Sequence, residues 1–180
     1  MALKYRKFMR STQRVSPTSI NNSQHPRGRF RVQSAYDADR EVVTFQCYVP
    51  SFTRPGIRHI VRVEFLDVPA DQLYQDEDSV EDNRERNGGQ LIPIPVLGQN
   101  EMKVRCSCPS FRFTGSEAAQ LYGSFIGGRY HPWRPNRTGR ASRNPNNEPM
   151  LCKHIIAFVE YLWQQGYVRY KMDSDLRSHM

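Results

Sequence analysis

The sequence predicts an α+β domain in which a small antiparallel sheet packs on one C-terminal helix, with long irregular loops between the elements. The first observation is that apolar and polar residues alternate in several stretches between residues 30 and 108, as in strands with one buried face. The second is that Leu151, Ile155 and Leu162 recur at helical spacing, with Gly166 placed to end the helix. Length is the third observation, because 180 residues suit one domain with appendages.

Shifts in composition divide the chain into segments, and residues 28–170 are expected to form one compact domain. In order, the segments are a basic extended arm at 1–28, a β-rich segment at 29–66, an acidic loop at 67–90, a module at 91–170 with a basic aromatic insertion at 109–150, and a polar tail at 171–180. Three of the four cysteines fall in the 91–170 module, which makes it the part of the chain with the clearest chemistry.

The N-terminal arm is strongly basic, and residues 1–31 contain no Asp or Glu. The arm is rich in Ser, Asn, Gln and Pro and shows no sustained hydrophobic period, so on its own it predicts a disordered segment. It is either an electrostatic tether to phosphate or to an acidic partner, or a solvated tail. The candidate contact residues of the arm are Lys4, Arg6, Lys7, Arg10 and Arg14.

Residues 30–66 predict three strands, of which the first two form a hairpin and the third has one wet face. Cys47 falls on the apolar face of the second strand, so it is expected to be a small core residue; the alternative is a substitute metal ligand. His59 lies in the third strand among arginines and is expected to be a surface or edge histidine.

Residues 67–86 reverse the sign of the charge, because acidic residues greatly outnumber the two arginines. We expect a solvated acidic loop, with a calcium site or a carboxylate cluster as alternatives. The loop could also dock against the basic arm of a neighbouring copy. The next stretch, at 91–97, contains Pro93 and Pro95, which confine it to an edge or irregular strand.

Two short pieces of the 91–170 module carry the spacing of a metal site: Cys106-Ser107-Cys108 and Cys152-Lys153-His154. In an extended strand, residues i and i+2 point to the same face, so Cys106 and Cys108 could bind one ion from one side. The same spacing fails inside a helix, so Cys152 and His154 are expected in the turn that enters the C-terminal helix. Zinc takes four such ligands in a tetrahedron.

Other interpretations of these cysteines remain open. Disulfides are disfavoured because Cys106 and Cys108 are too close in sequence to pair easily and no secretory leader opens the chain. Unliganded core thiols are a further alternative. A nucleophilic pair of Cys152 and His154 would lack a third group to orient it. The fold is therefore expected to include one structural zinc that clips the helix to the sheet.

The order Cys-x-Cys, long variable loop, Cys-x-His, with strands before and a helix after, resembles the SWIM-type zinc finger. In that family the two pairs close one structural zinc, and members serve nucleic-acid or protein binding in transposase-like, chromatin-related and signalling proteins. The fuller strings at residues 106–111 and 144–154 also resemble small SWIM-like proteins of tailed bacteriophages. The resemblance covers roughly residues 90–165, and the loop at 109–151 is much longer than a minimal finger needs.

The insertion between the ligand pairs interleaves aromatic and basic residues. This composition suits stacking on bases and contact with phosphates, and equally suits packing on a partner protein. The candidate contact residues of the insertion are Arg112, Arg129, Trp133, Arg134, Arg137, Arg140 and Arg143. His131 is expected to be an ordinary loop histidine, although it could replace a ligand.

Charge and the absence of other motifs narrow the class of protein. A net charge of +8 and a pI near 9.6 favour an anionic neighbour, most simply nucleic acid. No apolar run is long enough to span a membrane, so the chain is expected to be soluble and made in a reducing cytoplasm. No P-loop, nucleophile elbow, HExxH helix or dinucleotide glycine pattern is present, so neither enzymatic activity nor a small-molecule substrate is expected.

The sequence thus favours a non-enzymatic, zinc-stabilised structural or adaptor protein of a nucleic-acid-containing assembly. The leading candidate is a component of a tailed-phage virion that binds other protein subunits, with DNA or RNA as a further candidate partner of the basic arm and the insertion. The alternative is a free nucleic-acid-binding SWIM zinc-finger protein that assists replication, recombination or transcription.

Overall fold

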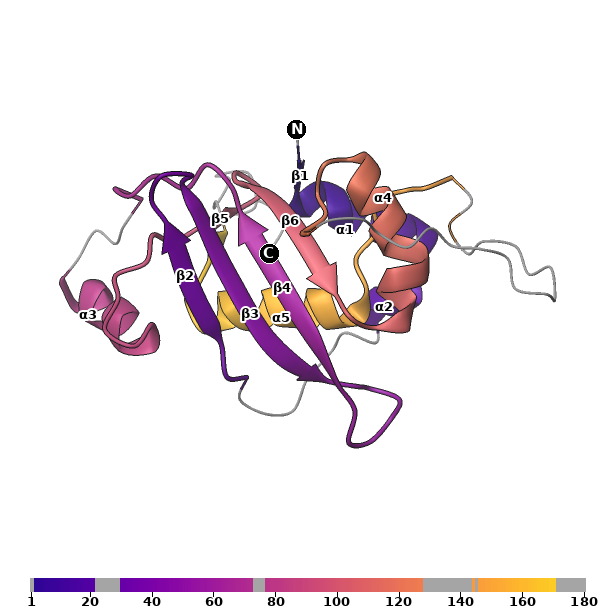
Figure 1. Ribbon diagram of the computed structural model, residues 1–180, viewed down its shortest axis with the longest axis horizontal. Coiled ribbons are helices and arrows are strands. Elements are labelled where there is room, and N and C mark those ends of the chain that lie inside the picture. Colours follow the sequence, from indigo (N-terminus) through magenta and orange to yellow (C-terminus); the bar gives the residue numbers. More distant parts are fainter. Residues whose placement is uncertain (1, 22–29, 73–76, 128–143, 145, 171–180) are drawn as a thin grey trace, which may run out of the picture.

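The computed structural model is a mixed α+β fold built on a five-stranded antiparallel sheet in the order β1-β6-β4-β3-β2, as Figure 1 shows. The structure describes residues 2–21, 30–72, 77–127, 144 and 146–170. The strands of this sheet are β1 (Leu3–Lys4), β2 (Gln33–Asp37), β3 (Val42–Pro50), β4 (Arg58–Phe65) and β6 (Glu101–Cys106). The helix α5 (Lys153–Gln164) packs on one face of the sheet, so the predicted fold class is confirmed.

The sheet forms because its central strands carry a strict period of two. In β3, Val43, Phe45, Cys47 and Val49 are buried, while the alternate residues 44, 46 and 48 are at least partly exposed. Strand β4 repeats the pattern, and the register sets Phe45 opposite Val63, so both strands turn their apolar side chains to the same face. The predicted hairpin and third strand are therefore present as β2, β3 and β4.

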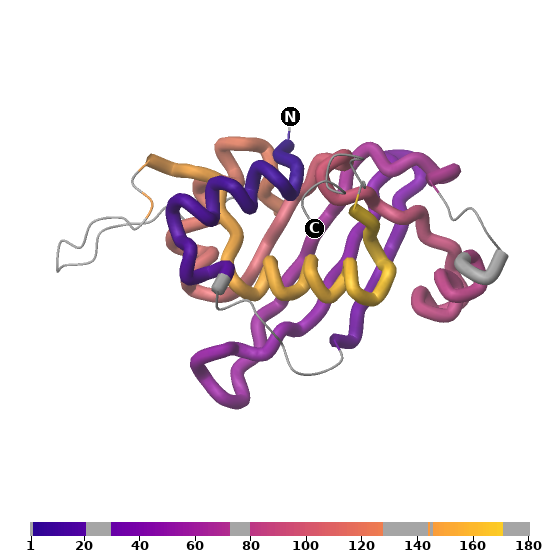
Figure 2. Tube along the Cα trace, turned by 180° about the vertical axis from the view of Figure 1, so that it is seen from behind, coloured from indigo at the N-terminus to yellow at the C-terminus, as the bar shows by residue number. Residues whose placement is uncertain are grey.

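The helix α5 covers the apolar face of the sheet, as the view from behind in Figure 2 shows. Ile155, Phe158 and Leu162 are fully buried, at the helical spacing that the sequence showed. The helix stops at Gln165, and Gly166 follows with φ of +74°, a left-handed conformation that glycine adopts without a steric penalty.

The prediction of an extended, disordered arm at 1–28 was wrong for the described residues. Residues 5–15 form the helix α1 (Tyr5–Val15), followed by α2 (Pro17–Asn21), and β1 pairs with the edge of β6. Tyr5, Phe8 and Thr12 are buried at helical spacing, and Thr12 Oγ1 accepts a hydrogen bond of 2.9 Å from the backbone N–H of Leu151. The segment is part of the core.

The acidic segment at 67–90 is also more regular than predicted, because it contains the helix α3 (Glu77–Arg86). The helix is tied to the chain after it by Asn83, a buried residue whose side-chain amide donates to the carbonyl of Ile92 at 2.8 Å and accepts from its N–H at 3.0 Å. The stretch at 91–97 ends in β5 (Val96–Leu97), which pairs in parallel with β7 (Arg169–Tyr170) in a small second sheet.

The insertion at 109–150 was predicted to be irregular, but its first part is helical. A π-helical turn (η1, Phe111–Gly115) leads into α4 (Ser116–Leu121), and the ring of Phe111 is buried beneath them. A side chain at Gly115 would lie 2.8 Å from the Phe111 ring, so only glycine fits this turn. Residues 128–143 and 145 lie outside the described residues. No described helix is long and apolar enough to cross a membrane.

The burial of α1 yields a stability prediction. Replacing Phe8 by Ala removes a ring with 0% exposure, and such truncations typically cost about 3–5 kcal/mol of unfolding free energy. We expect Phe8→Ala to lower the denaturant midpoint of the metal-loaded protein strongly, whereas Arg10→Ala, at an exposed site on the same helix, should change it little. Equal midpoints for the two variants would show that α1 is not part of the cooperative unit.

Candidate metal centre

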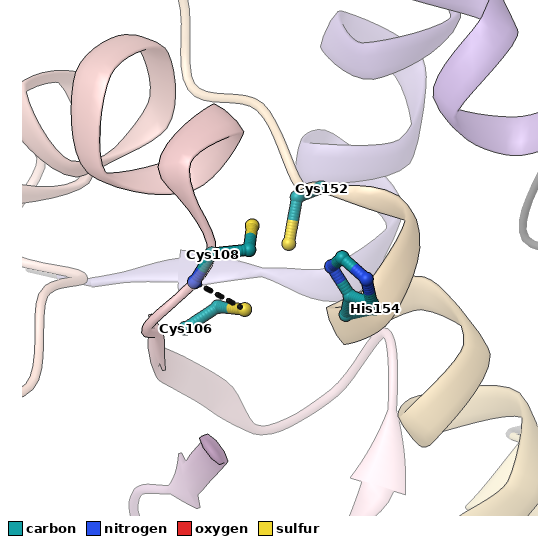
Figure 3. Close-up of side chains that lie close together, drawn as sticks. All are labelled: Cys106, Cys108, Cys152 and His154. Atoms are coloured by element: carbon teal, nitrogen blue, oxygen red, sulfur yellow. Dashed lines mark hydrogen bonds between the residues drawn. The ribbon is translucent and has the colours of Figure 1, made fainter. Parts of the chain in front are cut away.

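Four side chains meet where the sheet, the start of η1 and the start of α5 come together (Figure 3). Cys106 is the last residue of β6, and Cys108 follows just before η1. Cys152 is the N-cap of α5, with extended backbone angles, and His154 lies in the first turn of the helix. The prediction that Cys152 and His154 occupy the turn entering the C-terminal helix is thus confirmed.

The donor atoms of Cys106, Cys108, Cys152 and His154 all lie within 4.8 Å of one another, and all four residues are buried. In a tetrahedral site with metal–sulfur bonds of about 2.3 Å and metal–nitrogen bonds of about 2.0 Å, neighbouring donors lie roughly 3.5–3.8 Å apart. Small side-chain rotations would bring the four donor atoms from their present separations to those of a tetrahedral site. The four residues could therefore hold one metal ion.

Two backbone N–H groups point at the sulfur atoms of the first pair. Cys108 N–H donates to Cys106 Sγ at 3.4 Å, the bond drawn in Figure 3, and Phe111 N–H donates to Cys108 Sγ at 3.3 Å. Bonds of this kind favour the negatively charged thiolate over the thiol. The turn that follows β6 is therefore shaped to accept ionised sulfur.

His154 provides the clearest sign that the cluster is incomplete without a cation. The residue is buried, and neither Nδ1 nor Nε2 has a hydrogen-bond partner. Burying such a group unpaired is costly, and native structures rarely leave one so. A metal ion bound by one ring nitrogen would satisfy it.

The pKa values of the thiols agree with this interpretation. Burial raises the pKa of Cys106 and of Cys152 well above the ordinary thiol value. Hydrogen bonds from Cys106 and Cys152 hold the pKa of Cys108 far below it. Of the three buried thiols, Cys108 is the one favoured as a thiolate, and a divalent cation would allow the others to ionise.

Aromatic and imidazole rings enclose the outer side of His154. The His59 ring centroid lies 4.5 Å from that of His154, and the Phe52 centroid lies 5.2 Å away. Lys153 Nζ lies 5.1 Å from the centre of the Phe52 ring, so a cation sits close to the ligand set. Burial lowers the pKa of His59, with His154 adding to the shift, so the neutral ring is favoured.

His59 was predicted to be a surface or edge histidine and not a ligand, but its position beside the cluster was not foreseen from the sequence. It is partly exposed and lies outside the four-residue group. The signal was present, because His59 shares a strand face with Val61, and Val61 pairs across the sheet with Cys106. Placing His59 beside the cluster requires the pairing of β4 with β6, and no local sequence pattern predicts that pairing.

Cys47 lies in the core as predicted, and burial raises the pKa of its thiol. The candidate contact residues of the N-terminal segment, Lys4, Arg6, Lys7, Arg10 and Arg14, are all exposed. Arg14 pairs with Glu148, and Lys7 Nζ lies 5.7 Å from the Tyr122 ring centre. Arg112 is exposed and lies over Phe113.

The other candidate contacts of the insertion, Arg129, Trp133, Arg134, Arg137, Arg140 and Arg143, lie outside the described residues, as does His131. Comparison with protein families, curated proteins and solved structures gives no match for the chain.

The geometry predicts one metal ion per chain. Cys106→Ser and Cys152→Ser should each lose it, because the remaining ligands cannot close a tetrahedral site. Cys47→Ala is the matched control, since this cysteine is also buried but belongs to no ligand group, and it should keep the full complement. Metal analysis of protein purified under reducing conditions gives the stoichiometry. Retention of one ion by both serine variants would disprove the site.

Proposed function

We propose that the protein is a non-enzymatic, zinc-stabilised structural or adaptor protein of a nucleic-acid-containing assembly. The observation that carries this proposal is the buried Cys106, Cys108, Cys152 and His154 group. Three sulfur donors and one imidazole suit zinc, which accepts such ligands in a tetrahedron without redox chemistry. With four protein ligands no coordination position is open to a substrate, and closed zinc sites are structural.

The position of the group supports a structural role for the ion. Two ligands follow the sheet strand β6 and two open the helix α5, so one ion would join the two layers of the fold. Three thiolates, a neutral imidazole and a dication leave a charge of about −1. Lys153, with its ammonium group near the site, offsets this charge.

The exposed basic side of α1 supports an anionic partner. The helix contains no acidic residue and its apolar side packs in the core, so basic side chains such as Lys7 and Arg10 are exposed on its outer side. The SWIM-type class and a tailed-phage particle as the assembly are proposed on the ligand order and the sequence resemblance alone. Other subunits of the particle would then be its protein partners.

A free nucleic-acid-binding SWIM protein that assists replication, recombination or transcription is the second candidate. The same basic face of α1 favours it, because an ordered helix that presents cations at fixed spacing loses little entropy on binding phosphates. The two candidate functions differ in how tightly the isolated chain should bind DNA or RNA and in whether it should sediment with particles.

Removal of zinc should loosen the fold, because the ion joins β6 to α5. We expect chelation to lower the melting temperature and broaden the transition followed by near-ultraviolet circular dichroism. Zinc added back at one equivalent should restore the sharp melt, whereas magnesium, a hard ion that prefers oxygen ligands, should not. A melt that chelation leaves unchanged would argue against a structural ion.

The two candidate functions are separated by one pair of measurements. As an assembly component, the chain should sediment with nuclease-resistant particles from its source cells, and in isolation it should bind DNA or RNA with a Kd on the order of 10⁻⁶ M or weaker at physiological salt. Nanomolar binding that falls steeply with salt, without particle association, would select the free binder instead.

A further inference from the structure

The sheet has a second, open face, which includes the wet face predicted for the third strand. None of the described helices crosses β2, β3 or β4 on this side, which faces the viewer in Figure 1. Side chains on this face stand in rows across the strands, because paired residues of antiparallel strands point the same way. One row joins Tyr48 to Ile60, and the next joins Gln46, Arg62 and Arg105.

The register sets two like charges, Arg62 and Arg105, directly opposite each other on adjacent strands. Directly opposite residues in a sheet have Cβ atoms about 4.5–5.5 Å apart, and like charges at that distance destabilise the pair. Arg62 Nη2 donates to Glu64 Oε1 at 2.9 Å, but its Nε is buried without a partner. Within the described part of the chain, no carboxylate oxygen lies within 4.0 Å of the Arg105 guanidinium.

The Arg105 guanidinium has a defined place on the face. It lies against the backbone of Gly127, where a side chain would come within 2.8 Å of Arg105 Nη1. Lys103 follows on the same face of β6, opposite Glu64. Glu64 accepts from Arg62. On β6 itself, Glu101 accepts from the backbone N–H of Ala2 at 2.7 Å. Asp37 stands on the same face at the far edge of the sheet, on β2. Arg62, Lys103 and Arg105 therefore make the part of the open face on β4 and β6 positive.

An exposed aromatic ring lies one row from the arginine pair. Tyr48 is 54% exposed and Ile60, opposite it, is 42% exposed. Two residues along a strand span about 6.7 Å, so the ring and the guanidinium groups lie one step apart on one surface. Cations that track a backbone beside an aromatic ring that stacks on a base are the parts of single-strand binding surfaces.

We propose that Arg62 and Arg105 together bind a phosphate of single-stranded nucleic acid on the open face of the sheet, while Tyr48 stacks on a neighbouring base. The phosphate would accept hydrogen bonds from both guanidinium groups and compensate the two like charges on adjacent strands. A single strand fits because the stacked bases of a duplex are not available to a flat sheet face. This inference rests on the proposed function for the nature of the partner, and it adds a surface separate from α1.

The test measures binding of a fluorescent oligothymidine of about 15 nucleotides by anisotropy, using the full zinc-loaded chain, between 50 mM and 500 mM salt. We expect Arg62→Gln/Arg105→Gln to weaken binding at low salt. Each phosphate contact contributes about −0.7 to the slope of log affinity against log salt for single strands. Because the pair binds one phosphate, its loss should flatten the slope by about 0.7, so the difference in affinity from wild type should shrink about 5-fold per tenfold rise in salt.

The tyrosine gives an independent readout. Tyr48→Ala should weaken binding roughly 5- to 150-fold without changing the salt slope, because stacking on a base carries no charge. Tyr48→Phe keeps the ring and should bind as wild type does. Both changes are at an exposed position, so the metal content and melting temperature should stay those of the wild type.

The matched control for charge is Arg40→Gln/Arg84→Gln, which removes two exposed arginines outside the open face. If this control weakens binding as much as Arg62→Gln/Arg105→Gln does, the effect is net charge and the inference is overturned. It is likewise overturned if only Lys7→Gln/Arg10→Gln on α1 weakens binding, an outcome that leaves the proposed function standing.

Failure of the wild type to bind oligothymidine at 50 mM salt also overturns the inference, as does binding of polyglutamate instead through the same arginines. The second result would assign the face to an acidic protein. The proposed function is judged separately, by sedimentation with particles and by the effect of chelation, so its failure and that of the inference are distinguishable.

Discussion

The constraint on which this fold depends is the burial of three thiols and an imidazole at one point. Charged sulfur is costly inside a protein unless a cation compensates it, and an unpaired buried imidazole is costly as well. The chain accepts both at the junction of β6 and α5. An ion there would fix the end of one strand relative to the start of one helix, and these two elements carry much of the core.

The constraint extends to the N-terminus through a short series of contacts. Leu151, next to the ligand Cys152, donates its N–H to Thr12 Oγ1, and Thr12 in turn donates to the carbonyl of Phe8. The helix α1 is therefore attached to the segment that delivers the second ligand pair. A stretch that looks like a solvated arm in the sequence is packed against the part of the core that contains the Cys/His group.

The elements that could be predicted from the sequence are those specified by local patterns. Alternation identified β3 and β4, helical spacing identified α5, and the i, i+2 spacing placed one ligand pair at a strand and the other at a helix entry. The helix α1 was missed because its apolar side consists of few residues, among them Tyr5 and Phe8, within a polar and basic segment. The place of His59 and the pairing of Arg62 with Arg105 depend on strand register, which local patterns do not reveal.

The alternation of β6 links the metal centre to the open face of the sheet. Adjacent residues of a strand point to opposite faces, so Cys106 enters the buried cluster while Arg105 points away from it. Coordination of Cys106 would fix the position and twist of the strand end that presents Arg105 opposite Arg62. A closed structural ion would thus set the geometry of the proposed binding surface without touching it. One face of the sheet is buried in the core, and the other face carries Arg62 and Arg105.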